Sequence, residues 1–291
     1  MANSLREVKL RINSTQSTAQ ITKAMHMVSQ SKVRKAEKTY RAYQDFMRRI
    51  SNMVSQIIEK ADEEYQHPLL TPREVKKTAY FIITSDKGLA GAYNSSLFKA
   101  LAEKISTNHK SDDEFITAAI GKKGFSFITK MNYPLLSNEP TYVRDDVMFI
   151  DIVPLAKKVV EAYLNKEIDK LVIVYNHYVN SITQEIVFEE LLPIKKIEGN
   201  TSNIDYVYET GIEKTLNLVL PMYIEDIIYG IILDAKTSEH SARMNSMKNA
   251  TDNAEEIISK LQLLYNRARQ NTVTTELIDI IGGANAIGGE N

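Results

Sequence analysis

The chain has 291 residues, and its 36 basic and 37 acidic side chains give a formal net charge of −1 at pH 7. This near balance argues against a polyanion-binding protein, so we expect no nucleic-acid partner. The absence of cysteine excludes disulfides, thiolate catalysis and cysteine-ligated metal sites. No uninterrupted apolar run reaches the length of a membrane-spanning helix, so we expect no direct insertion into a membrane.

The beginning of the chain predicts one long helix over residues 1–67. This segment contains neither glycine nor proline, which helix interiors exclude, and Pro68 and Pro72 follow it. Its apolar residues alternate spacings of four and three, which is typical of a coiled-coil seam. The seam positions are Ala36, Tyr40, Tyr43, Met47, Ile50, Val54, Ile57 and Ala61.

Residues 75–195 alternate between strand-like and helix-like segments. The predicted strands are 78–84, 114–120, 170–176 and 183–192, and the predicted helices are 94–106, 122–130 and 153–165. Such alternation predicts a central α/β domain with a Rossmann-like, mostly parallel sheet and an antiparallel edge. Residues 196–208 have the composition of a linker.

The end of the chain, residues 209–287, predicts a second long helix. Residues 231–281 again lack glycine and proline, whereas Pro221 is expected to kink or split the helix. A second seam runs through Met244, Met247, Thr251, Ala254, Ile258, Leu261, Tyr265 and Ala268. The matching seams predict that the two terminal helices pair as a long antiparallel coiled coil, so the fold class is α/β with a helical rod.

The motifs that could carry chemistry are weak. The loop Ser85–Gly91 follows the first strand and leads into a helix, where phosphate loops lie, and 121–124 is placed similarly. Both lack the glycine spacing of nucleotide-binding motifs, which favours tight turns instead. The five histidines are not spaced as metal pairs, and adjacent Glu189 and Glu190 point to opposite faces of a strand. We therefore expect no catalytic residue, no cofactor and no metal.

The tip of the last helix is unusually apolar. Residues 273–289 carry only two charged side chains, Glu276 and Asp279, and their apolar residues fall on more than one face. Exposed, such a surface is an aggregation hazard, so a covering partner protein is one interpretation. The glycines at the end leave a frayed tail as the other.

Four segments carry a family resemblance. Residues 273–286 (VTTELIDIIGGANA) resemble the signature of the gamma subunit of F-type ATP synthase, and residues 238–244 and 266–270 resemble its last helix. Residues 21–28 (ITKAMHMV) are similar to its first helix, and Thr84–Gly91 with Asn94 to the loop after its first strand. The resemblance spans essentially the whole chain.

The resemblance implies a rotary function. The family's gamma subunit is the central shaft of the ATP synthase, coupling ion translocation to ATP synthesis or hydrolysis, and it has no catalytic site of its own. The implied partners are three alpha and three beta subunits, the epsilon subunit and the c-ring. The implied location is the cytoplasmic face of a bacterial cell membrane, as a peripheral protein.

The resemblance also implies partner-contact residues. Arg269, Gln270, Thr274 and the nearby Glu276 are expected to face beta subunits at the tip. Met25 and Arg243 are expected near a lower beta contact. Two alternatives stay open at this point, an α/β nucleotide-binding protein and a coiled-coil adaptor without rotary function.

Overall fold

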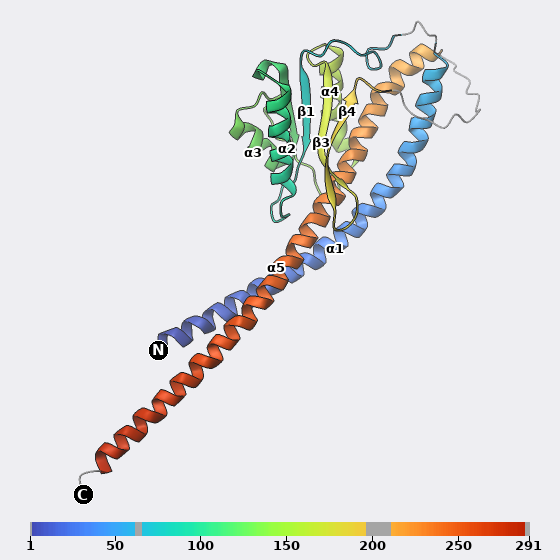
Figure 1. Cartoon of the computed structure of the whole chain (residues 1–291). Helices are drawn as coiled ribbons and strands as arrows, with labels where there is room; N and C mark the ends of the chain where they lie inside the picture. Colours follow the sequence, from blue (N-terminus) through green and yellow to red (C-terminus); the bar gives the residue numbers. More distant parts are fainter. Residues whose placement is uncertain (1, 62–65, 196–210, 289–291) are drawn as a thin grey trace. The chain divides into compact units, whose positions relative to one another are not determined.

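A computed structural model describes residues 2–61, 66–195 and 211–288 (Figure 1). Helix α1 covers Ala2–Glu59 and helix α5 covers Ile212–Gly288. Between them lie β1 (Thr78–Ile83), α2 (Tyr93–Asn108), a 3-10 turn (Asp112–Glu114), β2 (Phe115–Ile120), α3 (Lys122–Met131), α4 (Phe149–Leu164), β3 (Lys170–Tyr178) and β4 (Gln184–Leu192). The predicted order of strands and helices is confirmed.

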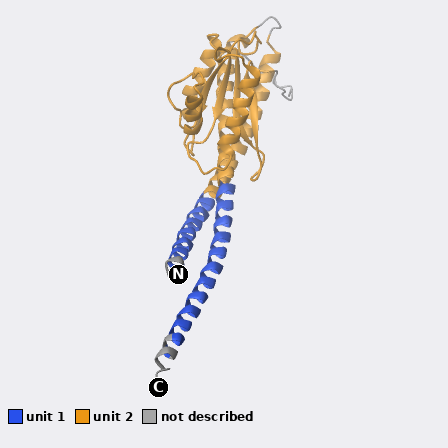
Figure 2. Cartoon of the chain, turned by 60° about the vertical axis from the view of Figure 1, so that its left-hand side comes forward, with its two compact units in different colours: residues 1–28, 244–291 blue, residues 29–243 orange. Residues whose placement is uncertain are grey.

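The chain divides into two compact units (Figure 2). Residues 1–28 and 244–291 form the smaller unit, and residues 29–243 form the larger one. Helices α1 and α5 both run without interruption through both units. Helix α1 ends at Glu59, eight residues before the end of the predicted helical segment 1–67. The predicted division into 1–67, 75–195 and 209–287 differs from these units, which cut across both long helices. The predicted linker at 196–208 lies outside the described residues.

The larger unit is built on one four-stranded sheet with the order β2-β1-β3-β4. Strand β1 pairs in parallel with β2 and with β3, whereas β3 and β4 form an antiparallel hairpin. All six residues of β1 are buried, as expected for a central parallel strand covered on both faces. The mostly parallel sheet with an antiparallel edge is therefore confirmed.

Two apolar clusters hold the sheet between helices. On one face, Tyr80 and Ile82 pack with Leu97 and Leu101 of α2 and Ile128 of α3. The other face packs against α4 and against the α1 and α5 segments of this unit, through Phe81, Ile173, Val159, Val54 and Ile228 among others. The larger unit thus has three layers, and Figure 1 shows α2 and α3 on one side of the sheet and α4 and α5 on the other.

Helices α1 and α5 pair antiparallel in each unit. In the larger unit the hydroxyl oxygens of Ser51 and Tyr223 lie 3.2 Å apart, and the Tyr40 hydroxyl donates to Asp234 over 3.1 Å. Residue numbers therefore fall along α5 as they rise along α1. In the smaller unit the Thr22 and Thr251 hydroxyls lie 2.8 Å apart. The predicted pairing of the terminal helices is confirmed.

Pro221 was expected to kink or split the last helix, and the expected split is wrong. Pro221 lies inside α5, which continues unbroken from Ile212 to Gly288. A proline removes one backbone hydrogen bond and crowds the preceding turn. The helix tolerates this because Leu220 and Ile224 on either side of the proline are fully buried in the core.

By length and composition alone, α5 is apolar enough to cross a membrane. Half of the residues in its most apolar window are buried inside the protein. Buried residues of this kind, such as Ile228 and Ile232, make the apolar stretch a core element of the larger unit.

Candidate functional site: the terminal helix pair

The loop after β1 is filled by the chain's own groups. The backbone N–H of Lys122 donates to the Asp86 carboxylate over 2.9 Å, and the N–H of Lys123 donates to the Ser85 carbonyl over 3.2 Å. The N–H of Gly124 donates to the Thr84 hydroxyl over 2.9 Å. These are the donors at the start of α3 that a phosphate would need.

The glycines here have a packing reason. Gly121 has φ of +94°, and a Cβ at this residue would collide with the Thr84 carbonyl oxygen. A Cβ at Gly124 would lie 2.8 Å from Thr84 Oγ1, which is closer than real contacts. The glycines therefore let the start of α3 approach β1 closely, which fits the tight turns predicted here from the sequence.

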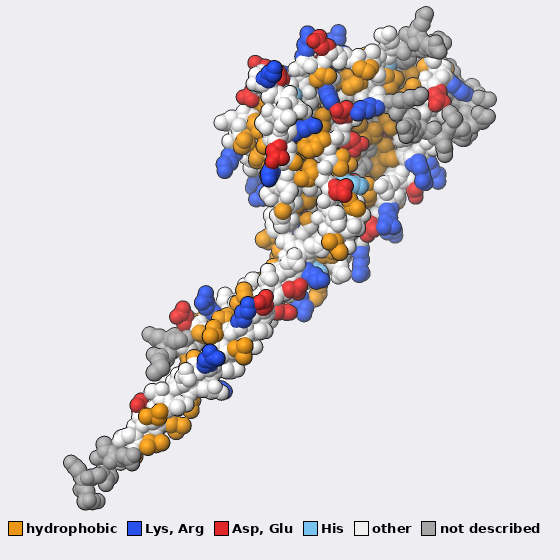
Figure 3. Space-filling view, in the orientation of Figure 1, with side chains coloured by type: hydrophobic (Ala, Val, Ile, Leu, Met, Phe, Trp, Pro, Cys, Tyr) orange, Lys and Arg blue, Asp and Glu red, His pale blue; other side chains and the backbone are white. Residues whose placement is uncertain are grey.

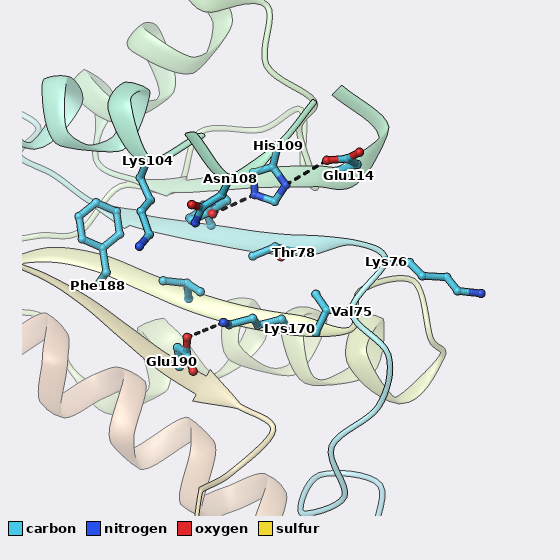
Figure 4. Close-up of a pocket in the computed structure, with 12 residues that line it drawn as sticks. Val75, Lys76, Thr78, Lys104, Asn108, His109, Glu114, Lys170, Phe188 and Glu190 are labelled. Carbon is cyan, nitrogen blue, oxygen red and sulfur yellow. Dashed lines mark hydrogen bonds and ion pairs between the residues drawn. The ribbon is translucent and has the colours of Figure 1, made fainter. Parts of the chain in front are cut away.

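An open cleft of about 650 Å³ lies at the other end of the sheet, beside the C-terminal turn of α2 (Figure 4). His109 Nε2 lies 2.9 Å from the Tyr80 hydroxyl, and its Nδ1 lies 3.7 Å from a Glu114 oxygen. Burial lowers the pKa of His109 and raises that of Tyr80. Both shifts favour the neutral forms, so the contacts among Tyr80, His109 and Glu114 are of a structural kind.

Three further charges of the cleft, Lys104, Lys170 and Glu190, are engaged within the chain. Lys170 is paired with Glu190, which also accepts from Lys195 over 2.8 Å. The ammonium of Lys104 stands 5.8 Å from the centre of the Phe188 ring, the two side chains facing each other in Figure 4. Among the residues that the structure describes, no group of three or more His, Cys, Asp or Glu could hold a metal ion.

The exposed surface of the helix pair is the better candidate. In the smaller unit, the predicted seam is the least exposed face of α5, and Met247, Thr251 and Ala254 are buried. Thr22 Oγ1, which lies against Thr251, also donates to the carbonyl of Ala19. A polar pair within an apolar seam fixes the register of paired helices.

Beyond this seam the end of α5 leaves large apolar side chains uncovered (Figure 3). Leu277, Ile278, Ile280 and Ile281 are 54–67% exposed. Successive positions on a helix point about 100° apart, so these residues cover more than one face. A single partner helix could not bury them all, and this geometry suits an enclosing sleeve.

The candidate contact residues have different environments. Arg269, Gln270, Thr274 and Glu276 are all exposed on α5 in the smaller unit. The Thr274 hydroxyl donates to the carbonyl of Gln270 over 2.9 Å, so that its polarity is satisfied within the helix. Met25, on α1 in the same unit, is half-buried.

Arg243 is held inside the larger unit. Its guanidinium donates to Glu239 over 2.7 Å and approaches the carbonyls of Gly88 and Lys87 at 3.3 and 3.4 Å. Only 11% of its side chain is exposed. The guanidinium of Arg243 is therefore largely enclosed within the larger unit.

The sequence reading missed a buried polar stretch of α5 next to Arg243. Asp234, Lys236, Glu239 and His240 are 2–6% exposed. The only available signal was that the polar run 234–241 interrupts an apolar helix without glycine or proline.

Comparisons with known proteins agree with one another. A family model described as ATP synthase matches residues 4–287. The ATP synthase gamma chain of Exiguobacterium sp. (strain ATCC BAA-1283 / AT1b) is 43% identical over 284 residues, which cover 98% of this chain and 99% of that protein.

Solved structures are similar as well. A chain from the central stalk and c-ring of Tetrahymena thermophila mitochondrial ATP synthase is 26% identical, with a TM-score of 0.60 over 79% of this chain and 99% of that chain. A chain of the Euglena gracilis mitochondrial ATP synthase in rotational state 3 has a TM-score of 0.66 at 18% identity, over 100% of this chain and 97% of that chain. At that identity the second likeness concerns the fold alone.

Proposed function

We propose that the exposed end of α5 turns inside a ring of three alpha and three beta subunits. The chain belongs to the ATP synthase gamma-chain family and is the central rotor shaft of a rotary ATP synthase. The shaft couples ion translocation to ATP synthesis or hydrolysis at that ring. We call this exposed end of α5 the bearing. The observation that supports it is the set of large apolar residues left uncovered at 277–281.

We further propose that the beta subunits contact Met25, Arg269, Gln270, Thr274 and Glu276. All five lie in the smaller unit, and the last four are exposed on one helix. We also propose a beta-subunit contact for Arg243, through the small exposed part of its side chain, because its guanidinium is already paired with Glu239.

The chain is a component of the enzyme complex, and we propose that it has no catalytic site of its own. The filled loop after β1 supports this, because the Lys122, Lys123 and Gly124 N–H groups already have acceptors. The epsilon subunit and the c-ring are the proposed partners of the α/β domain, segment 75–195, at the cytoplasmic face of a bacterial cell membrane. The helical segments 1–67 and 209–287 form the proposed shaft.

Two truncations test the bearing. Deleting the residues after Arg269 removes Gln270, Thr274, Glu276 and the exposed apolar residues, so we expect impaired assembly or turnover of the reconstituted hexamer. Deleting only 284–291 is the matched control and is expected to be tolerated, because those residues are mostly small and glycine-rich. ATP hydrolysis and ATP-driven ion pumping are measured for each. Normal assembly and pumping with the longer deletion would rule out the bearing.

A further inference from the structure

One stretch of α5 is buried on every side. Residues 231–241 are 0–7% exposed without a break, although a helix at a domain surface normally exposes one face. Seven of these eleven residues are polar or charged, from Asp234 to Ser241. Burial of polar groups is unfavourable unless they find partners. Some partners lie within α5 itself, where Lys236 pairs with Glu239 and Thr237 donates to the Leu233 carbonyl. Among the described residues, Ser238 Oγ has no hydrogen-bond partner.

Four other parts of the larger unit contribute contacts to Asp234, Ala235, His240 and Ser241 and to the adjacent Arg243. We call these four parts the collar, and they are Lys32 and Tyr40 of α1, Lys87, Gly88 and Tyr93 around the start of α2, Asp145 before α4, and His177, Tyr178 and Ser181 of the β3–β4 hairpin. All of the collar and all of residues 231–241 lie within residues 29–243.

Asp234 makes the largest set of collar contacts. Its carboxylate accepts from the Tyr40 hydroxyl at 3.1 Å and from the Tyr178 backbone N–H at 2.8 Å. His177 Nδ1 lies 2.6 Å from the same carboxylate. One side chain of α5 therefore ties α1 and strand β3 together.

The other collar contacts surround the following turns of α5. The Tyr93 hydroxyl donates to the Ala235 carbonyl over 3.0 Å, and the Ser241 hydroxyl donates to the Ser181 carbonyl over 2.7 Å. His240 Nε2 lies 3.8 Å from Asp145.

Two ion pairs lie beside these contacts. Lys32 of α1 pairs with Asp145 over 2.6 Å, and Arg243 reaches from Glu239 to the carbonyls of Lys87 and Gly88. Contacts therefore reach this region of α5 from α1, from the β3–β4 hairpin, from the loop after β1 and from the loop before α4.

The two kinds of contact resist different motions. Apolar packing between the sheet and α5 opposes separation, but it is non-directional and permits small rotations. Hydrogen bonds weaken steeply as their angles change, so a ring of them opposes rotation of the helix inside the domain. A rotor needs that resistance, because torque must pass between the α/β layer and the shaft.

We propose that the collar is the torque lock that makes the α/β domain and α5 turn as one body, with Asp234 as its principal positioning residue. This proposal rests on the rotor role of the chain. Without the lock, the domain would twist relative to α5 under load, and part of the rotation driven at one end would not reach the other.

A torsional measurement on the assembled complex tests the lock. The chain has no cysteine, so a single cysteine at Lys99 of α2, whose side chain is 79% exposed, attaches a bead to the α/β layer. A cysteine at Leu218, which is 68% exposed on α5, attaches a bead to the shaft helix itself. The hexamer is fixed to a surface, and the angular fluctuations of each bead are recorded in a stalled state.

The expected result depends on where the bead is attached. Asp234→Ala removes the acceptor for Tyr40, Tyr178 and His177, so the fluctuations of the α2 bead should widen while those of the α5 bead stay the same. Asp234→Asn keeps an acceptor oxygen and should restore most of the stiffness. Tyr40→Phe removes one contact and serves if Asp234→Ala does not assemble; it should widen the α2 signal to a smaller extent.

The matched control is Asp169→Ala. Asp169 is also a mostly buried carboxylate with several donors, Arg73 and the N–H groups of Lys76 and Lys77, but none lies on α1 or α5. Its loss should lower stability without widening either signal. Unchanged α2 fluctuations in assembled Asp234→Ala and Tyr40→Phe complexes, or equal widening at both beads, would overturn the lock. A wild-type complex that does not rotate would instead contradict the rotor role.

Discussion

Asp145 of the collar and two residues of the α5 stretch that it surrounds are held in defined protonation states. Burial alone raises the pKa of Asp145, but the hydrogen bond from Lys32 and the nearby positive charges outweigh it and leave the pKa below its ordinary value. Burial raises the pKa of Asp234, which its hydrogen bonds from His177 and Tyr178 only partly oppose. Burial lowers the pKa of His240 to about 4, so this imidazole is neutral at physiological pH.

His240 should make the stability of the chain sensitive to mild acid. Above pH 6.5 the imidazole is neutral in both the native and the unfolded state, and its contribution is fully present. As the pH falls from 6.5 towards 4, the unfolded state binds a proton that the native state excludes, so the free energy of unfolding decreases. The loss amounts to about 3 kcal/mol for a shift of this size.

His240→Gln should flatten the pH dependence in that window. Urea unfolding of wild type and variant between about pH 7.5 and about pH 4 checks this. The range brackets the titration of an ordinary histidine, at about pH 6.5. Asp234 acts in the opposite direction, because its raised pKa favours proton uptake by the native state, but it is present in both proteins. Parallel stability curves for the two proteins would contradict the assignment of a neutral, buried His240.

At the scale of elements, the close approach of α1 to α5 depends on a glycine. Gly230 of α5 faces the Tyr43 ring, and a Cβ at Gly230 would lie 3.1 Å from that ring. The Tyr43 hydroxyl donates to Asp226, and its ring meets Tyr229 edge-on at a centroid distance of 4.9 Å. The tyrosine is thus fixed and has little room to move aside.

Gly230→Leu should therefore destabilise the larger unit. The added side chain must displace Tyr43 or separate the helices, and overpacking of this kind lowers the free energy of unfolding by roughly 1–3 kcal/mol. Gly282→Leu is the matched control, because it lies in the same helix with nothing within 4 Å of an added Cβ. Thermal unfolding of both variants gives the comparison; equal stability of Gly230→Leu and wild type would show that the helices do not meet there.

The sequence predicted most elements because their signals are local. Strand β1 and helix α3 begin at the predicted residues, Thr78 and Lys122. Helix α4 begins four residues earlier than predicted, at Phe149, because the Asp151 carboxylate caps the Met148 N–H over 3.0 Å. The burial of Asp234 was not predictable, since its partners Tyr40 and His177 are distant in sequence and become neighbours only after folding.

The whole molecule combines two physical tasks along the same two helices. The larger unit contains the three-layered core and the collar. The smaller unit contains an apolar seam with the Thr22–Thr251 hydroxyl pair inside it, and the exposed apolar end of α5. Because α1 and α5 run through both units without a break, a rotation applied to one unit has a continuous helical path to the other. The candidate contact residues at 269–276 remain a prediction from the family resemblance, because nothing in their composition specifies beta subunits.

Rotation of this chain inside the ATP synthase can be measured in single molecules. A complex with one bead on a cysteine at Lys99 and the hexamer fixed to a surface is supplied with ATP. The rotor role predicts that the bead turns in one direction, in steps, while ATP is hydrolysed. Sustained hydrolysis by the same immobilised complexes with a bead that only fluctuates about a fixed angle would contradict it.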